Sequence, residues 1–183
     1  MSAEIYKCLV VGPRNVGKSS IIRRYLEDAF QETYTATIGV GMNVAQLDFP
    51  SGKVVLSVVD LGGQQSFAAL RNRFYQGAHF VMVVYDVTDQ ATFDAIPKWV
   101  ESLNQTVCTM GNSLVGALIA NKVDREQDRV ILETDGSQLA GVLSLDYFET
   151  SAKTGQNVSE LFIHAASRSR RNLIDDSSSS EIE

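Results

Sequence analysis

The chain has 183 residues, of which 44% are hydrophobic and 21% are charged, and its formal net charge is −6 at pH 7. This length and composition are ordinary for one globular domain that buries a core of its own. The negative charge argues against a bare nucleic-acid-binding role, and no apolar run is near the roughly 18 residues of a membrane span.

Hydrophobic runs alternate along the chain with stretches of helical pattern. The run KCLVVG (7–12) predicts a buried strand, and the segment after it predicts a helix that begins near Lys18. The runs VAQLDF and VVLSVVD flank the turn residues 50–53 (PSGK), so they predict an antiparallel hairpin.

Three later runs are continuously apolar, which is typical of strands covered on both faces. They are FVMVVYD (80–86), SLVGALIANKVD (113–124) and LDYFETSAK (145–153). Helical stretches are predicted at about 66–76, 91–108, 133–141 and 156–172. Strand–helix–strand repeats indicate parallel pairing with right-handed crossovers. We therefore expect an α/β fold of three layers, with helices on both faces of a mostly parallel six-stranded sheet that has one antiparallel edge strand.

The expected domain covers residues 1–172, and the acidic, serine-rich segment 173–183 is interpreted as a disordered tail. The N-terminal residues MSAEIYK lack the long apolar region of a signal peptide. Cys8 and Cys108 are interpreted as reduced structural thiols, so we expect a cytoplasmic protein. His79 and His164 have no metal-ligand spacing and are interpreted as packing or surface residues.

Residues 12–20 read GPRNVGKSS and contain the spacing G-x-x-x-x-G-K-[ST] of a phosphate-binding loop. The loop follows a predicted strand and opens a predicted helix, so successive N–H groups and the helix N-terminus would form an anion site. Lys18 would bridge the β- and γ-phosphates, and the Ser19 hydroxyl would bind Mg2+. The loop residues expected to contact a nucleotide are Asn15, Val16, Gly17, Lys18, Ser19 and Ser20.

A second motif begins where the run VVLSVVD ends. Asp60 at a strand end beside a phosphate loop can hold Mg2+ through water. Gly63 leaves its N–H free to approach a terminal phosphate, and Gln64 can orient an attacking water. The alternative is a turn that merely contains Asp and Gly, which the phosphate loop disfavours.

Two further motifs indicate the base. In the segment 121–124 (NKVD), the Asp124 carboxylate can accept from N1–H and the 2-amino group of guanine, whereas adenine offers neither donor. A helix cap is the alternative role for Asp124. In the segment 151–153 (SAK), the Ala152 N–H would reach the guanine oxygen and the Lys153 stem would cover the ring. The expected base contacts are Asn121, Lys122, Asp124, Ser151, Ala152 and Lys153.

GPRNVGKS, Thr37, DLGGQ, NKVD and ETSAK stand in the order and spacing of small GTPases of the Ras superfamily, which the chain resembles over about residues 5–172. YTATIGV (34–40) and FYQGAHFVMVVYDVTDQATF (74–93) are most similar to the Rab branch. The resemblance implies the P-loop GTPase fold, GTP or GDP and Mg2+ as ligands, and hydrolysis of GTP to GDP and phosphate.

Several site residues follow from the resemblance alone. Thr37 would be the second hydroxyl ligand of Mg2+, Phe30 would lie edge-on to guanine, and Tyr34 would close over the phosphates. Residues of about 32–41 and 61–76 would be switch segments that γ-phosphate and Mg2+ order and that hydrolysis releases. The catalytic residues would be Gln64, Lys18 and Thr37, and the metal ligands would be Ser19, Thr37 and Asp60.

The chain also departs from the Rab pattern. Val59 stands where Rab proteins usually carry Trp, and Gly41 stands where they usually carry Asp. Gly62 adds backbone freedom to the second switch segment. The last 70 residues hold no cysteine for prenylation, so we expect membrane association to be indirect. The arginines near the end of the chain are interpreted as a solvated helix face, with lipid headgroups as the alternative partner; they are Arg168, Arg170 and Arg171.

The leading hypothesis is a GTP-hydrolysing molecular switch that is slow without an activating partner and acts in trafficking or in cytoskeletal or membrane organisation. Effectors, GTPase-activating proteins and exchange proteins would bind the switch segments of a monomer, with no nucleic acid involved. The alternative is a nucleotide-bound interaction module with little or no hydrolysis. A phosphoryl-transferring kinase is disfavoured because NKVD has no function in most such kinases.

Arg14 is the unusual residue of the phosphate loop, because a long cation stands where the resemblance implies contact with γ-phosphate. It would obstruct the arginine finger of a partner, or supply part of that charge in cis, or point to solvent. The sequence leaves the three alternatives open.

Overall fold

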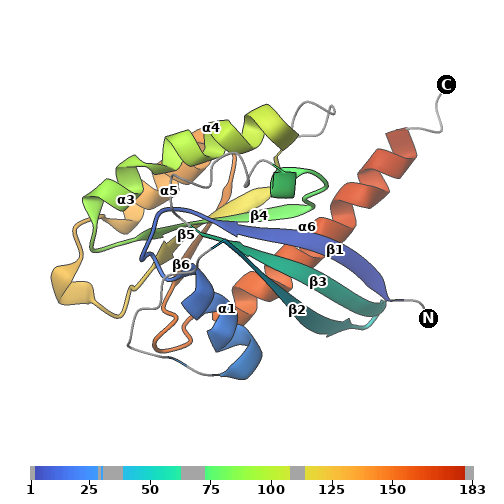
Figure 1. The fold of residues 1–183 in the computed structure, drawn as a ribbon, viewed down its shortest axis with the longest axis horizontal. Helices are drawn as coiled ribbons and strands as arrows, with labels where there is room; N and C mark the ends of the chain where they lie inside the picture. The colour runs from blue at the N-terminus through green and yellow to red at the C-terminus, as the bar shows by residue number, and fades with distance from the viewer. Residues whose placement is uncertain (1–2, 29, 31–38, 63–72, 108–113, 180–183) are drawn as a thin grey trace.

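The computed structural model describes residues 3–28, 30, 39–62, 73–107 and 114–179. The strands in chain order are β1 (Glu4–Val11), β2 (Val40–Phe49), β3 (Gly52–Leu61), β4 (Phe80–Asp86), β5 (Gly116–Asn121) and β6 (Asp146–Thr150). The helices are α1 (Lys18–Glu27), α3 (Gln90–Asp94), α4 (Ile96–Val107), the 3-10 turn η3 (Glu126–Asp128), α5 (Glu133–Val142) and α6 (Val158–Ser179). Figure 1 shows how they are arranged around the sheet.

The strands form one sheet in the order β2-β3-β1-β4-β5-β6. All neighbours pair in parallel except β2 and β3, which form an antiparallel hairpin from Val40↔Leu61 to Phe49↔Gly52. The hairpin places β2 at one edge of the sheet, and the predicted turn lies between its strands. The predicted α/β fold, with a mostly parallel six-stranded sheet and one antiparallel edge strand, is therefore confirmed.

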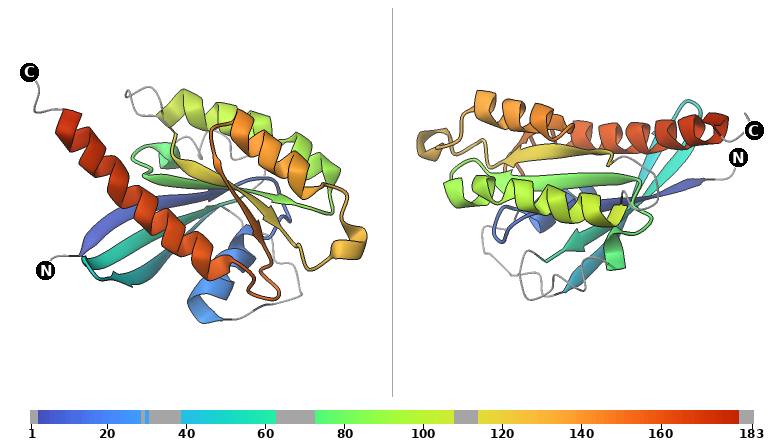
Figure 2. Two further views of the ribbon diagram at one scale, coloured as in Figure 1. Left: turned by 180° about the vertical axis from the view of Figure 1, so that it is seen from behind. Right: turned by 90° about the horizontal axis from the view of Figure 1, so that it is seen from above.

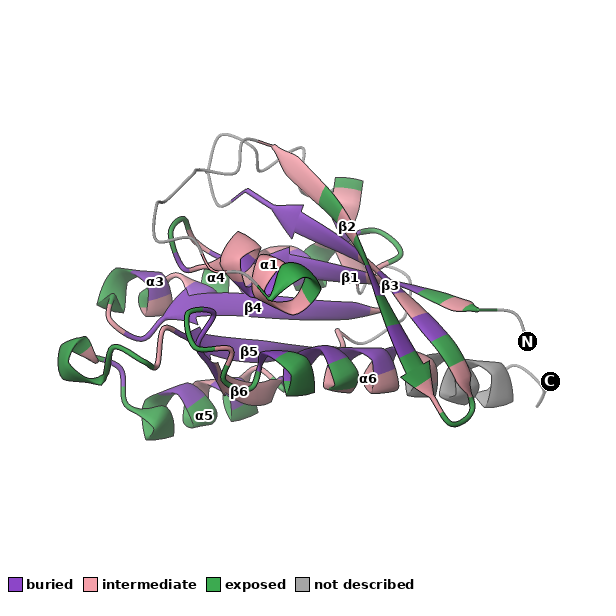
Figure 3. Cartoon of the chain, turned by 90° about the horizontal axis from the view of Figure 1, so that it is seen from below, coloured by how far each residue is buried: buried purple, intermediate pink, exposed green. Residues whose placement is uncertain are grey.

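Helices cover both faces of the sheet, with α1 and α6 on one face and α3, α4 and α5 on the other (Figures 1 and 2). The central strand β4 is buried at every residue (Figure 3) because its side chains alternate between two cores. Phe80, Met82 and Val84 enter the core under α1 and α6. Val81, Val83 and Tyr85 enter the core under α4 and α5. Each such side chain contributes on the order of 1.5–3 kcal/mol through burial.

The predicted helix over 91–108 is divided into α3 and α4 at Ala95. Pro97 explains the division, because it has no N–H to donate to the carbonyl of Phe93 and its ring would clash there. At the second position of α4 the missing N–H costs nothing, since the first turn of a helix has no partner for it. The Asp89 side chain caps α3 by accepting from the Ala91 N–H at 3.0 Å.

Helix α6 ends at Ser179 instead of near residue 172, so its backbone includes most of the segment predicted as a disordered tail. Arg170 holds the helix against the sheet, since its guanidinium donates to Glu4 at 2.8 and 3.0 Å and to Ser51 at 2.5 Å. Once a packed turn exists, each further helical residue adds a hydrogen bond at little cost. Residues 180–183 lie outside the described part of the chain.

Two of the three arginines interpreted as a solvated helix face form ion pairs within the protein. Arg170 pairs with Glu4, and the Arg168 Nε lies 3.3 Å from the Asp146 carboxylate. Arg171 has no described side chain. The charges of both described arginines are therefore matched within the protein.

Cys8 is fully buried and free, and burial raises the pKa of its thiol to about 12. Because the thiolate is the reactive form, this residue is inert, whereas Cys108 lies outside the described residues. The His79 Nδ1 accepts from the Lys7 N–H at 2.9 Å. The His164 Nε2 lies 2.8 Å from the Asp146 carboxylate. Both histidines therefore have packing roles.

Candidate functional site

The polar motifs meet at the carboxyl edge of the parallel strands, where ligands bind in open α/β sheets. The phosphate loop joins β1 to α1, Asp60 lies near the end of β3, and Asn121 ends β5. The segment 151–153 follows β6, whose last residue is Thr150. The sheet thus brings together motifs that are separated by up to about 140 residues of sequence.

Glycine is required at both ends of the phosphate loop. Gly12 has φ +134°, and a Cβ there would clash with the carbonyl oxygen of Val84. Gly17 has φ +96°, and a Cβ there would clash with the amide nitrogen of Asn121. Gly17 is also the N-cap of α1 and offers no side chain to cap the first turn, so the N–H groups there remain suited to an anion. The loop lies directly against the ends of β4 and β5.

Lys18 is 6% exposed, and its Nζ donates to the carbonyl oxygens of Gly12 at 2.9 Å and Pro13 at 2.5 Å. These contacts fold the side chain back over the phosphate loop and fix an ammonium charge there. A positive charge beside the α1 N-terminus attracts phosphate. The predicted contact of Lys18 with the β- and γ-phosphates stays a prediction.

Ser19 and Asp60, two of the predicted metal ligands, lie in contact. The Ser19 hydroxyl donates to the Asp60 Oδ2, and Asp60 is only 4% exposed. Hard hydroxyl and carboxylate oxygens are the donors that Mg2+ prefers, so this pair fits that ion. Within the described residues no group of three or more His, Cys, Asp and Glu side chains could hold a metal. An ion at this pair would take its other ligands from water and phosphate.

Asn121 connects the phosphate loop to the segment after β6. It is 1% exposed, and its Nδ2 donates to the Val16 carbonyl at 2.8 Å. Its Oδ1 accepts from the Thr150 hydroxyl and from the Ala152 N–H, both at 3.2 Å. The sequence placed Asn121 at the base, and the structure shows that it joins two motifs. The Ala152 N–H, expected at the guanine oxygen, here donates to Asn121.

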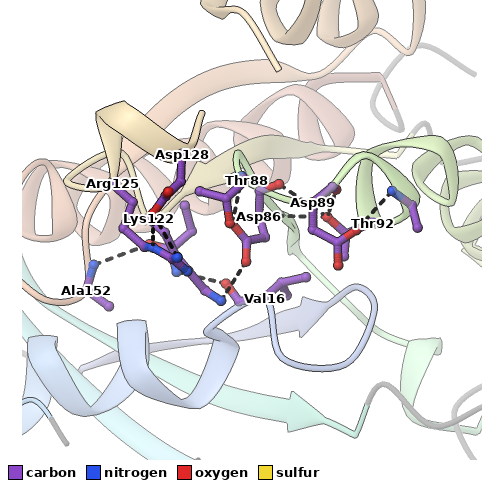
Figure 4. A network of polar contacts seen from close by, with 11 residues as sticks. Val16, Asp86, Thr88, Asp89, Thr92, Lys122, Arg125, Asp128 and Ala152 are labelled. Carbon is purple, nitrogen blue, oxygen red and sulfur yellow. Dashed lines mark hydrogen bonds and ion pairs between the residues drawn. The ribbon is translucent and has the colours of Figure 1, made fainter. Parts of the chain in front are cut away.

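Asp86 belongs to the polar network of the candidate site, and the motif analysis missed it. Its Oδ2 lies 2.6 Å from the Lys122 Nζ, and its Oδ1 accepts from the Thr88 N–H at 2.9 Å and hydroxyl at 2.7 Å. Figure 4 shows Asp86 and Lys122 pointing toward one another from the ends of β4 and β5. The Asp86 side chain is 7% exposed and that of Lys122 is 23% exposed. Asp86 ends an apolar run as Asp60 does, and that pattern could have identified it.

The segment 151–153 is held from several sides. The Ser151 hydroxyl donates to the Asp124 Oδ1 at 2.6 Å, which joins the NKVD and SAK motifs. Arg24 of α1, which the sequence did not indicate, donates to the Ala152 carbonyl at 2.8 Å and the Lys153 carbonyl at 2.5 Å. Asp124 is itself exposed, so its carboxylate remains open to a ligand.

The remaining predicted residues divide into two groups. Arg14 and Asn15 are exposed on the phosphate loop, and Asn15 has φ +62°. Phe30 is partly buried and packs against the core under α1 and α6. Four predicted residues and most of both switch segments lie outside the described residues; the four are Tyr34, Thr37, Gly63 and Gln64.

Comparisons with known proteins identify the family of the chain. The model of the Ras family matches residues 7–171. The chain belongs to the Ras family. It is 32% identical to "Ras-related protein Rab-10" of Diplobatis ommata over 162 residues, which are 88% of this chain and 80% of that protein. It is 33% identical to "Ras-related protein RIC1" of Oryza sativa subsp. japonica over 162 residues, 88% of this chain and 79% of that protein.

Membership of the Ras family confirms the predicted class and activity. The chain is a Rab-like small GTPase, a molecular switch that binds GTP or GDP with Mg2+ and hydrolyses GTP. The alternative of an interaction module without hydrolysis is not favoured. Members of the Ras family interact with effectors, GTPase-activating proteins and exchange proteins. In the described part of the chain, no helix has the length and apolar character to cross a bilayer.

Proposed function

We propose that the polar network at the carboxyl edge of the sheet is the guanine nucleotide site of this GTPase. The observation that carries the proposal is the position of Asn121, whose amide contacts both Val16 of the phosphate loop at 2.8 Å and Ala152 at 3.2 Å. One buried side chain thereby fixes the distance between a phosphate-binding segment and a base-selecting segment. A guanine nucleotide has an anionic end and a donor-rich base that match these two segments.

The phosphate end is assigned to residues 15–20, whose N–H groups and Lys18 charge would hold the β- and γ-phosphates. Ser19 and Asp60, together with Thr37, would hold Mg2+, which neutralises phosphate charge when it is bound. The hydroxyl–carboxylate contact of Ser19 with Asp60 supports this assignment.

The base end is assigned to Asp124 and the segment 151–153. The Asp124 carboxylate would accept from N1–H and the 2-amino group of guanine, and the Ser151 hydroxyl at 2.6 Å orients that carboxylate. Lys122 is held by Asp86 at 2.6 Å, so its stem has a fixed position beside the base site. Phe30 would contact the guanine edge, and Tyr34 and Gly63 would lie at the phosphates.

We assign the positioning of the attacking water to Gln64, with Lys18 and Thr37 stabilising the charge that develops on the phosphates. Effectors and regulators would bind the switch segments near 32–41 and 61–76 of a monomer. The cellular role would be trafficking or membrane organisation, which the similarity to "Ras-related protein Rab-10" supports. The location would be cytoplasmic, which the free thiol of Cys8 supports. The GTPase domain would end near residue 172, where the family match at residue 171 ends.

Single-turnover hydrolysis tests the role of Gln64. Purified protein loaded with GTP should convert it to GDP over minutes to hours, since hydrolysis without a partner is slow. The Gln64→Leu variant should retain GTP binding and lose most of this rate, whereas Gln65→Leu, the adjacent control, should not. Hydrolysis that is unchanged in Gln64→Leu would contradict the assignment.

A further inference from the structure

Arg24 makes an unusual set of contacts for a residue in the second turn of α1. Its side chain is 16% exposed. Nε donates to the Ala152 carbonyl at 2.8 Å, and Nη2 donates to the Lys153 carbonyl at 2.5 Å. The guanidinium fork thus reaches across 128 and 129 residues of sequence to two successive carbonyls. Gly155 lies beside the Arg24 stem, since a Cβ on that glycine would be 3.6 Å from the Arg24 Cδ.

The two carbonyls belong to the segment that is assigned to the base. The Ala152 peptide is held from both sides, because its N–H donates to Asn121 at 3.2 Å and its carbonyl accepts from Arg24. Ser151, the preceding residue, is held by Asp124 at 2.6 Å. Asn121 and Asp124 belong to the NKVD motif, whereas Arg24 comes from the helix that begins at the phosphate loop.

Charge-assisted hydrogen bonds to a fixed fork are stronger and more directional than neutral ones. Two of them leave the 151–153 segment little freedom relative to α1. Lys18 and Ser19, the expected phosphate contacts, form the N-terminus of α1. Through Arg24, the same short helix is hydrogen-bonded to the segment of the expected base contacts.

We propose that Arg24 is a positioning residue of the nucleotide site, which holds the Ser151-Ala152-Lys153 segment at the distance from the phosphate loop that a guanine nucleotide requires. This inference rests on the proposed function, because it takes the segment to contact the base. Without Arg24, the segment samples positions in which the base contacts are not made, and bound GDP leaves faster.

The remaining contacts of Arg24 supply a matched control. Nη1 donates to the carbonyl oxygen of Asp28 at 3.1 Å and to its Oδ1 at 3.0 Å, at the C-terminal end of α1. Asp28 has φ +48°, a conformation that glycine adopts without strain, so Asp28→Gly removes the ion pair and preserves the end of the helix. This variant leaves both contacts of Arg24 with the 151–153 segment in place.

The experiment measures the release of fluorescently labelled GDP from the full chain after addition of excess unlabelled GDP. Arg24→Ala should release GDP at least about tenfold faster than the wild type, equivalent to ~1.4 kcal/mol. Arg24→Lys keeps the charge and loses the fork, so its rate should lie between the two. Asp28→Gly should stay within about twofold of the wild type, as exposed helix-end ion pairs contribute little.

Two further readouts separate positioning of the base segment from general loosening of the protein. The acceleration in Arg24→Ala should persist when EDTA removes Mg2+, because the altered contacts are at the base and not at the metal. Thermal unfolding at saturating GDP should show a folded variant with one cooperative transition.

A release rate of Arg24→Ala within about twofold of the wild type would overturn the inference. So would an equal acceleration in Asp28→Gly, or an acceleration that EDTA abolishes. If Arg24→Ala does not fold, a wild-type release rate in Arg24→Lys overturns it. If the wild-type protein binds no guanine nucleotide, the proposed function fails, whereas normal wild-type binding with unchanged variants removes only the role of Arg24.

Discussion

The two ends of the sheet contain polar clusters of different construction. At the carboxyl edge, Asn121 and Arg24 bond to backbone atoms of loops, and the side chain of Asn121 is almost fully buried. At the opposite end, Arg170 joins Glu4 and Ser51 through exposed or half-buried side chains. Buried groups that hold loop backbone give a ligand site a defined shape. The opposite cluster instead joins α6 to the start of β1 and to the β2–β3 turn. The comparison therefore predicts that changes at the carboxyl edge affect nucleotide binding, and that changes at the opposite end affect stability.

A large effect on nucleotide binding is expected for Asp86→Asn at the carboxyl edge. The substitution preserves the acceptor for Thr88 but removes the charge that holds the Lys122 Nζ at 2.6 Å. Because this carboxylate is 7% exposed, water replaces little of the lost interaction. We expect GDP affinity to fall about 10- to 100-fold in equilibrium titration, a change of ~1.4–2.7 kcal/mol.

The matched control for Asp86→Asn is Asp89→Asn, which changes the exposed cap of α3 and leaves Lys122 untouched. It should bind GDP with wild-type affinity. Equal losses in both variants would mean that the β4–α3 loop as a whole, and not the Asp86–Lys122 pair, supports the site.

A smaller effect, on stability, is expected at the opposite end of the sheet. There, Arg170→Ala removes the contacts with Glu4 and Ser51. The melting temperature should decrease by about 2–4 °C, as a modest loss of stability does in a chain of this size. GDP affinity, measured in the same preparation, should remain at the wild-type value. A clear loss of GDP affinity would contradict the prediction that this end of the sheet affects stability and not nucleotide binding.

A smaller, pH-dependent effect is expected from His79, which is also remote from the carboxyl edge. Burial, together with the nearby Lys7 charge, lowers the pKa of His79 from 6.5, and its Nδ1 accepts from the Lys7 N–H. The folded protein therefore binds fewer protons than the unfolded chain. The contribution of His79 to stability is present above pH 6.5 and decreases as the pH falls below that value.

Urea titrations at pH 7.5 and 5.5 check this sign. The wild type should lose more stability between the two pH values than His79→Gln, which cannot be protonated. An identical pH dependence of stability in both proteins would show that groups other than His79 cause it.

The smallest effect is expected for Arg14→Gly. Arg14 is exposed on the phosphate loop, and no hydrogen bond or ion pair to it is found in the described part of the chain. Intrinsic GTP hydrolysis should therefore change by less than about twofold in single-turnover assays. Slower hydrolysis would instead indicate that Arg14 supplies charge in cis, and faster hydrolysis would indicate obstruction.

The fold was predictable where hydrophobic runs are continuous and bounded by polar residues. The strand over 80–86 matches β4 at both ends, since every residue of that run is buried. The break at Ala95 was missed because the apolar pattern continues through it, and only the missing N–H of Pro97 divides the helix. The end of α6 was missed because polar composition alone does not show where helix propagation stops.

The site was predictable as far as its residues form contiguous motifs. Lys18, Ser19 and Asp60 could be proposed from the sequence because phosphate and metal chemistry require those residue types at those spacings. Arg24 was not, because its partners are two backbone carbonyls more than 120 residues away, and a carbonyl carries no sequence signal. The sequence assigned Asn121 to the base only. Its contact with Val16 could not be predicted, because that contact depends on how closely β5 approaches the phosphate loop.

The most direct test of the central claim is a competition titration in which unlabelled GDP, GTP and ATP displace labelled GDP from the wild type and from Asp124→Ala. GDP and GTP should compete at least about 10^4-fold better than ATP for the wild type, because adenine offers neither of the donors that guanine presents to the Asp124 carboxylate. Asp124→Ala should lose affinity for GDP and GTP by orders of magnitude while its thermal unfolding without nucleotide stays close to that of the wild type. Displacement by ATP as strong as by GTP, or unchanged GDP affinity in Asp124→Ala, would contradict the account.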